Sequence, residues 1–172
     1  AAANVLVITD SLTQTFNRRH MESLVHDEVE RAQRYHQSTA LIILDIDYFK
    51  SVNDNYGHPM GDKILRQVCD ILGSNLRQSD ALGRWGGEEF LIEINNCNTD
   101  TAKIIAEKIR ALIEKTYFTV EKHVLQLTVS IGIAHVSANN QNRDEVINLA
   151  DKALYQAKHL GRNRVVSADE LE

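Results

Sequence analysis

Two glutamates, Glu88 and Glu89, directly follow a pair of glycines, Gly86 and Gly87, near the middle of the chain. A two-residue Gly-Gly loop predicts a tight hairpin, because glycine accepts the positive φ angles of the primed turns without steric cost. Two carboxylates beside a hairpin tip are poorly suited to a core. They are well suited to a hard cation such as magnesium, which takes oxygen ligands. Taken alone, the string is explained equally well by a solvated turn.

A second acidic pair ends the apolar run of residues 41–44. Asp45 and Asp47 alternate along the chain, so they share one face at the carboxyl end of a predicted buried strand. Ligands of open α/β sheets bind beyond the carboxyl ends of the strands. If this strand pairs beside the Gly86-Gly87 hairpin, Asp45 and Glu88 can meet across it. The two acidic pairs together therefore predict a metal site.

Composition limits the classes of function that fit. A chain of 172 residues with 43% hydrophobic and 25% charged residues can bury the core of one globular domain. A net charge of −5 argues against a broad nucleic-acid surface. Cys69 and Cys97 lack the spacing of metal ligands, and no apolar run reaches the length of a membrane span. We expect a cytoplasmic domain that neither binds nucleic acid nor inserts directly into a membrane, although a missing N-terminal region could tether it to the inner membrane.

Apolar periodicity and turn residues predict the order of the elements. The expected helices are residues 18–37, 59–76, 99–115 and a last helix that is capped by Asn142 with Glu145 and ends at Gly161. The expected strands are residues 39–46, 81–85, 88–94, 124–136 and 164–166. Residues 1–9 are expected to be the stub of an upstream linker or helix. The order predicts an α+β fold with a βαββαβ core, in which helices cover one face of a mainly antiparallel sheet.

Four ordered blocks of the chain resemble the GGDEF domain of diguanylate cyclases. Residues 86–90 give the signature as Gly-Gly-Glu-Glu-Phe, the GGEEF variant. Residues 44–50 with 53–62 resemble the second block, residues 10–13 with 17–19 the opening motif, and residues 150–158 with 161–163 the closing motif. The resemblance covers nearly everything from residue 10 to residue 166. It departs at Gln14 and Thr15, where the family has Gly-Leu, and this departure bears on local loop geometry more than on the metals.

The resemblance implies a palm-like nucleotidyl cyclase fold over residues 10–172, with a central sheet surrounded by helices. It also implies an enzyme of bacterial signalling that condenses two GTP into cyclic di-GMP and two pyrophosphates. The 3′-hydroxyl of one GTP attacks the α-phosphate of the other, and each domain of a homodimer holds one GTP. The implied cofactor is Mg²⁺, with Mn²⁺ as an alternative.

The same resemblance implies a role for each acidic residue of the predicted site. Asp45, the carbonyl of Ile46 and Glu88 are expected to be the metal ligands. Glu88 is also the expected proton acceptor, and Glu89 is a second catalytic residue beside it. Asp47 is expected to be structural.

The resemblance implies eight substrate-binding residues: Tyr48, Phe49, Lys50, Asn53, His58, Asp62, Lys158 and Arg162. The first three are expected to cradle the terminal phosphates through two backbone amides and an ammonium group. Lys158 and Arg162 add positive charge there, unless they are only solvated residues near a helix C-terminus. Asn53 and Asp62 resemble the residues that read guanine, and His58 orders their loop. Alternatively, Asn53 is only a turn residue and Asp62 only an acid in the first turn of a helix.

Arg77 and Asp80 precede the signature at the spacing where the family has an inhibitory site for its product, cyclic di-GMP. An ordinary surface ion pair is the competing explanation. Two other functions remain open: a catalytically silent GGDEF module that acts as a receptor for cyclic di-GMP or GTP, and a purely structural dimerisation module.

Overall fold

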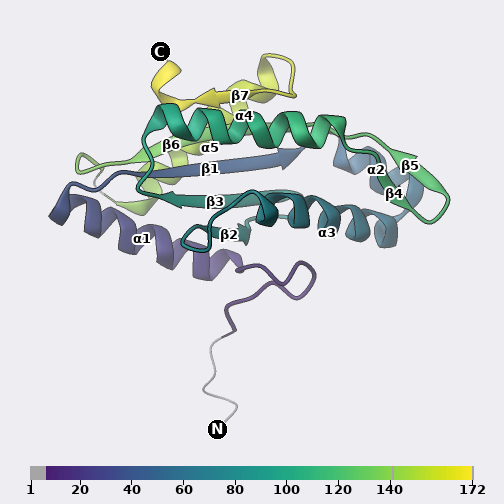
Figure 1. The fold of residues 1–172 in the computed structure, drawn as a ribbon, viewed down its shortest axis with the longest axis horizontal. Helices are drawn as coiled ribbons and strands as arrows, with labels where there is room; N and C mark the ends of the chain where they lie inside the picture. The colour runs from purple at the N-terminus through teal and green to yellow at the C-terminus, as the bar shows by residue number, and fades with distance from the viewer. Residues whose placement is uncertain (1–6, 141, 172) are drawn as a thin grey trace, which may run out of the picture.

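The computed structural model describes residues 7–140 and 142–171. Its centre is a five-stranded sheet in the order β2-β3-β1-β6-β7. The strands are β1 (Thr39–Ile46), β2 (Ala81–Arg84), β3 (Glu89–Asn95), β6 (Val129–Val136) and β7 (Val165–Ser167). All neighbours pair antiparallel except β6 and β7, which are parallel. The predicted α+β fold with a mainly antiparallel sheet is confirmed (Figure 1).

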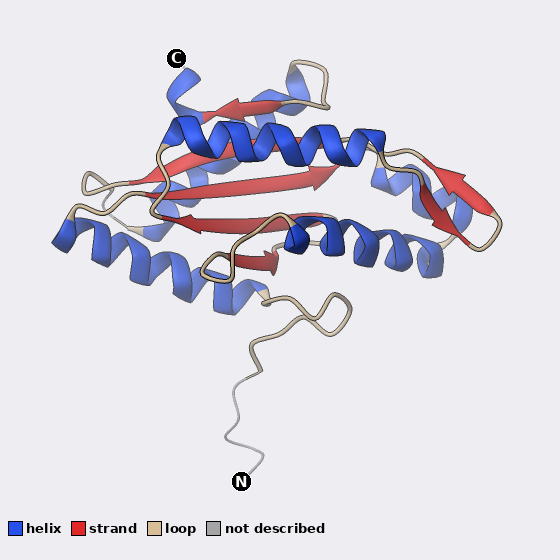
Figure 2. Ribbon diagram, viewed as in Figure 1, coloured by secondary structure: helices blue, strands red, loops and turns tan. Residues whose placement is uncertain are grey.

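Helices cover both faces of this sheet (Figure 2). The helices are α1 (Arg18–Tyr35), α2 (Phe49–Tyr56), α3 (His58–Ser74), α4 (Thr99–Lys115) and α5 (Arg143–His159), followed by the short 3₁₀ helix η2 (Ala168–Glu170). The even-numbered apolar residues of β1 pack with α2, α3 and α4, whereas Leu41 and Ile43 pack with α1 and α5. The prediction that helices cover one face is therefore wrong. The reason is that every residue of β1 is buried, and a strand buried on both faces needs a layer on each side.

Close packing of α5 on the sheet depends on Gly132. A Cβ atom at this position would lie 2.4 Å from both the carbonyl oxygen of Ala150 and the backbone nitrogen of Leu154. Because the absence of a side chain lets α5 lie directly on β6, the C-terminal end of α5 is brought to the end of β1.

Two predicted segments differ from the observed elements. The strand predicted over residues 124–136 is divided, because β5 (His123–Leu125) pairs with β4 (Phe118–Val120) in a separate two-stranded sheet, while β6 begins at Val129. The polar segment expected between β1 and the next helix contains α2. The turn at Gly57, with φ of 90°, separates α2 from α3, so α3 begins at His58 and ends at Ser74.

The hairpin that joins β2 to β3 is not the predicted two-residue turn. The N–H groups of Trp85 and Gly86 both donate to the carbonyl of Glu89, at 2.8 and 3.2 Å, so the loop holds residues 86–88. Among the described residues, the glycines with positive φ are Gly57 and Gly161, and neither signature glycine adopts a primed-turn conformation. Glu88 therefore lies inside the loop, and β3 begins one residue later than predicted, at Glu89.

The entry segment is held against the sheet edge. Residues 7–17 contain no helix, and Phe16 forms a parallel bridge with Gly83 on β2. The stub expected over residues 1–9 lies largely outside the described residues, since description starts at residue 7. In the described part of the chain, no helix is long and apolar enough to cross a membrane.

Candidate active site

Asp45 and the two glutamates meet where β1 and β3 lie side by side. Asp45 is opposite Glu89 in the antiparallel register, and the N–H of Ile46 donates to the carbonyl of Glu88 at 3.2 Å. The predicted neighbourhood of Asp45 and Glu88 is therefore present. It arises because β3 leaves the hairpin loop at the point where β1 ends.

Asp45 is 5% exposed, and its two carboxylate oxygens differ in their surroundings. Oδ2 accepts a hydrogen bond from the ammonium group of Lys158, which comes from the last turn of α5. Oδ1 is buried and has no hydrogen-bond partner among the described residues. A buried carboxylate oxygen without a partner is costly unless a ligand satisfies it.

The electrostatics of the three acids support a cation site. Burial raises the pKa of Asp45, against the lowering effect of Lys158. Burial and then the charge of Asp45 raise the pKa of Glu88, and the same two causes raise the pKa of Glu89. Like charges held close together disfavour ionisation, and a bound cation would reverse this effect.

A magnesium ion fits this donor set if the substrate supplies the remaining ligands. Within residues 7–140 and 142–171, no cluster of three His, Cys, Asp or Glu side chains is arranged to hold a metal ion by itself. Magnesium is commonly bound by one or two carboxylates together with substrate phosphates. The unsatisfied Oδ1 of Asp45 and the neighbouring Glu88 match that pattern.

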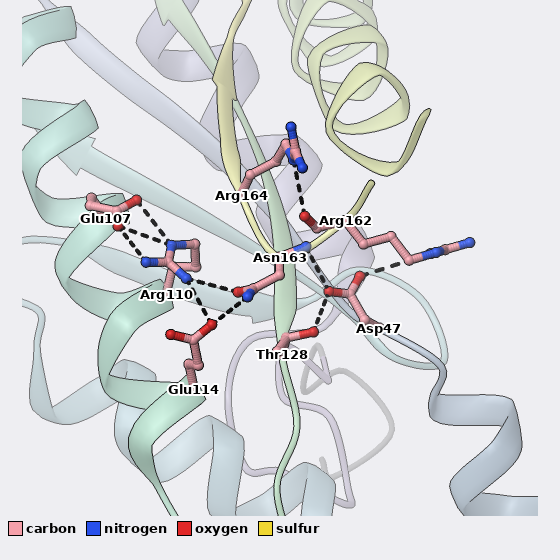
Figure 3. Close-up of polar contacts among 8 residues, drawn as sticks. All are labelled: Asp47, Glu107, Arg110, Glu114, Thr128, Arg162, Asn163 and Arg164. Carbon is pink, nitrogen blue, oxygen red and sulfur yellow. Dashed lines mark hydrogen bonds and ion pairs between the residues drawn. The ribbon is translucent and has the colours of Figure 1, made fainter. Parts of the chain in front are cut away.

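Asp47 has a different role from Asp45, although the two are only two residues apart. Its side chain is 1% exposed. Oδ1 accepts from the hydroxyl of Ser130 at 2.7 Å. Oδ2 accepts from the hydroxyl of Thr128 at 2.7 Å and from the N–H of Asn163 at 3.0 Å (Figure 3). Because both of its oxygens accept hydrogen bonds from within the chain, Asp47 joins β1 to β6 and to the loop after α5, as its expected structural role requires.

Several of the predicted phosphate-binding groups lie at the start of α2, next to Asp47. Tyr48 precedes the helix with φ of 58°, and the described residues provide no side-chain cap there. The first N–H groups of a helix have no partner within the helix, which makes them available to an anion. The guanidinium of Arg162 lies 4.9 Å from the centre of the Tyr48 ring, and Lys50 is exposed on the first turn. The structure therefore brings Tyr48, Phe49, Lys50 and Arg162 to one place.

The predicted guanine readers lie where α2 meets α3. The Oδ1 atom of Asn53 is buried without a hydrogen-bond partner in the described part of the chain. A Cβ atom at Gly61 would lie 2.0 Å from this oxygen, so the glycine makes room for the amide. Asp62 is half-buried on the next position of α3, and His58 is exposed at the start of that helix.

Comparison with known proteins identifies the family. The family model described as "Diguanylate cyclase, GGDEF domain" matches residues 7–164. The chain belongs to the GGDEF domain family of diguanylate cyclases. Probable diguanylate cyclase DgcT of Escherichia coli strain K12 is 39% identical over 162 residues, which is 93% of this chain and 35% of that protein. Response regulator PleD of Caulobacter vibrioides is 37% identical over 163 residues, which is 94% of this chain and 36% of that protein. The chain thus spans about a third of the length of these relatives.

Solved structures of GGDEF domains share the whole fold. The GGDEF domain of DgcB from Caulobacter crescentus, solved in complex with c-di-GMP, has a TM-score of 0.92 and 29% identity, with 97% of this chain and 99% of that chain covered. The active GGEEF domain of a diguanylate cyclase from Vibrio cholerae has a TM-score of 0.82 and 32% identity, with 88% and 96% covered. The similarity to GGDEF domains confirms the predicted fold.

Arg77 and Asp80 of this GGDEF domain contact each other and lie apart from the acids. Asp80 accepts from the backbone N–H of Arg77 at 2.8 Å and from its Nη2 at 3.2 Å. The side chain of Arg77 is 58% exposed, whereas that of Asp80 is 3% exposed. The arginine is accessible to a ligand, and the carboxylate is already engaged in closing the turn before β2.

Sequence reasoning missed one residue that holds the signature loop of the GGDEF domain. The guanidinium of Arg84 donates to the carbonyl of Gly87 from Nη2 at 2.9 Å and from Nε at 3.2 Å, and Nη1 lies 3.5 Å from Asp10. A basic residue two positions before the glycines was the available signal. The contact fixes the loop that contains Glu88 to the entry segment.

Proposed function

We propose that this domain synthesises cyclic di-GMP from two molecules of GTP, with two domains facing each other and each holding one GTP. The observation that carries the proposal is the group of Asp45, Glu88 and Glu89 where β1 ends and β3 begins, with one buried carboxylate oxygen still unsatisfied among the described residues. Membership of the diguanylate cyclase family supports the choice of GTP as substrate.

In each of two steps, the O3′ atom of one GTP forms a bond to the α-phosphorus of the other, and pyrophosphate leaves. Glu88 accepts the proton of the attacking hydroxyl. The place of Glu88 in the hairpin loop, beside the end of β1 that carries Asp45, supports this role. Asp45, the carbonyl of Ile46 and Glu88 would hold magnesium, which would neutralise phosphate charge and lower the pKa of the hydroxyl.

Lys158 changes partner in this proposal. Its ammonium group pairs with Asp45 in the absence of substrate and stabilises a carboxylate that burial would otherwise neutralise. When GTP binds, the phosphates provide a stronger negative partner, and Lys158 joins Arg162 and Lys50 in holding them. The amides of Tyr48 and Phe49 complete the phosphate pocket at the start of α2.

Guanine recognition is assigned to the corner between α2 and α3. The Asp62 carboxylate can accept from the N1–H and N2–H₂ groups of guanine, and the Asn53 amide offers both a donor and an acceptor. Adenine lacks that pair of donors, so a pocket with an unsatisfied Asn53 oxygen should reject ATP. His58 orders the loop between the two helices.

The same proposal covers the location, assembly and product inhibition of the domain. The domain works in the cytoplasm, where GTP is available, on residues 10–172 and as a homodimer during turnover. Cyclic di-GMP inhibits its own synthesis by binding at Arg77 and Asp80. The exposure of the Arg77 side chain supports this site, since a guanidinium whose Nε and Nη2 face Asp80 can still stack on a guanine ring.

Incubation with GTP and magnesium, followed by chromatography of the products, tests the proposal. The wild type should form cyclic di-GMP, while Asp45→Asn and Glu88→Gln should lose synthesis and keep the thermal midpoint within a few degrees. Asp70→Asn, an exposed acid on α3, is the matched control and should retain activity. Normal turnover in either site variant would refute the metal assignment. Binding of cyclic di-GMP without any turnover would favour the receptor function instead.

A further inference from the structure

The loop between α5 and β7 has an unusual backbone. Gly161, Arg162 and Asn163 are consecutive and have φ angles of 123°, 65° and 47°. Glycine accepts positive φ freely and asparagine tolerates it, but arginine rarely adopts it. A conformation of this kind persists only where surrounding contacts determine it. Here the contacts of Asn163 hold the backbone in this conformation.

Asn163 uses its backbone N–H and both polar atoms of its side chain (Figure 3). The backbone N–H donates to Oδ2 of Asp47 at 3.0 Å. The side-chain Oδ1 accepts from Nη1 of Arg110 at 2.8 Å, and Nδ2 donates to Glu114. The residue therefore links the end of β1 to the C-terminal half of α4.

The partners on α4 are themselves held in place. The guanidinium of Arg110 donates from Nε to both oxygens of Glu107 at 3.0 Å, and its Nη1 lies 3.4 Å from Glu114. The Arg110 side chain is only 16% exposed. Glu107 holds one edge of the planar guanidinium, and this fixes the direction in which Nη1 donates to Asn163.

Arg162 extends away from this network (Figure 3). Its Nη1 lies 3.8 Å from Asp47, and its guanidinium lies over the ring of Tyr48 at the start of α2. Because Arg162 and Asn163 are adjacent and both have left-handed backbones, a rotation of Asn163 would turn the Arg162 side chain away from α2. None of the α4 residues in the network belongs to the proposed site.

We infer that Asn163 is a positioning residue that directs the guanidinium of Arg162 to the β- and γ-phosphates of bound GTP, and that Arg110 and Glu114 hold Asn163 in that orientation. This inference rests on the proposed function, since it assumes that GTP occupies the pocket at α2. It extends the functional unit to α4, which contributes no residue to the metal or guanine sites.

The test compares binding of two probes by calorimetry. 3′-Deoxy-GTP has the triphosphate but lacks the attacking hydroxyl, so it cannot react, and GMP has the base without the β- and γ-phosphates. Asn163→Ala should bind 3′-deoxy-GTP about tenfold more weakly, as expected for the loss of one hydrogen bond to a charged group, and should bind GMP within about twofold of the wild type.

A double-mutant cycle separates positioning from general destabilisation. In an Arg162→Ala background, Asn163→Ala should cause no further loss of 3′-deoxy-GTP affinity, because the group that it positions is already absent. Asn98→Ala is the control for stability. Asn98 caps α4 by accepting from the N–H of Thr101 at 2.8 Å, so its loss should lower the thermal midpoint without changing affinity.

Arg110→Lys provides a second variant that keeps the positive charge and removes the fork that holds Asn163. It should reproduce the selective loss of 3′-deoxy-GTP binding, and it serves as the test if Asn163→Ala does not fold. Wild-type affinity for 3′-deoxy-GTP in the folded variants, or additive losses in the cycle, would overturn the inference and leave the proposed function standing. Failure of the wild type itself to bind 3′-deoxy-GTP would overturn the proposed function first.

Discussion

Glu93 is a buried acid that the proposed chemistry does not use. It lies on β3 between Leu41 of β1 and Ala81 of β2, is 3% exposed, and its Oε1 has no hydrogen-bond partner in the described residues. Burial raises the pKa of Glu93 to about 8, with the charge of Glu28 adding to the effect. The side chain is therefore protonated in the folded protein at neutral pH.

The magnitude of its effect on stability follows from the raised pKa. The unfolded chain loses the Glu93 proton near pH 4.5, whereas the folded chain retains it up to about pH 8. The contribution of Glu93 to the free energy of unfolding is fully present below its pKa in the unfolded chain. It falls as the pH rises toward its pKa in the folded protein. One pKa unit corresponds to about 1.4 kcal/mol, so the loss is about 1.4 kcal/mol per pH unit, and on the order of 5 kcal/mol in all. Glu93→Gln removes this loss, because an amide does not ionise.

Urea unfolding at a series of pH values from about 5 to 8 measures the effect, since the free energy of unfolding is obtained at each pH. The difference between Glu93→Gln and the wild type should grow in favour of the variant by about 1.4 kcal/mol per pH unit. Taking the difference removes the contributions of the active-site acids, which are common to both proteins. Glu121→Gln is the control, because the Glu121 side chain is 73% exposed. Its free energy of unfolding should vary with pH in parallel with that of the wild type. A Glu93→Gln profile that is also parallel would refute the reasoning.

Three further predictions concern ligands and assembly. Gly61→Ala should weaken GMP binding by roughly tenfold, because the new Cβ would occupy the place of the Asn53 oxygen, and unchanged calorimetry would remove Asn53 from the guanine site. Fusion of a dimeric coiled coil ahead of Asn4 should raise the rate per protomer through effective concentration, and a rate independent of both fusion and protein concentration would contradict the two-domain mechanism. Arg77→Ala should relieve inhibition by cyclic di-GMP in initial-rate assays, and equal product binding in wild type and variant would rule out the Arg77 and Asp80 site.

The parts of the fold that the sequence predicted depend on local patterns. The alternation at the end of β1 places Asp45, and the hairpin order brings Glu88 beside it. The cap of α5 is also local, because Asn142 accepts from the N–H of Glu145 at 3.0 Å, as predicted. Gly161 follows the end of that helix with positive φ, as a C-terminal glycine does.

The parts that could not be predicted depend on contacts between distant segments. The break before β6 occurs where Thr128 turns to contact Asp47, 81 positions away along the chain. Two adjacent glycines do not distinguish a two-residue loop from a three-residue loop, because the pairing of Trp85 with Glu89 decides the register. Arg110 matches no motif in the sequence, and only its contact with Asn163, 53 positions away along the chain, gives it a role.

The contact between Asp47 and Asn163 joins residues that are 116 positions apart. Proteins are made from the N-terminus, so both acidic segments leave the ribosome well before the loop that carries Arg162. That loop leads directly into β7, which pairs with β6 in the finished sheet. A chain whose translation stops before α5 is complete therefore has Asp45, Glu88 and Glu89 but lacks Lys158 and Arg162. Under the proposed function, we expect such a truncated chain to make no cyclic di-GMP.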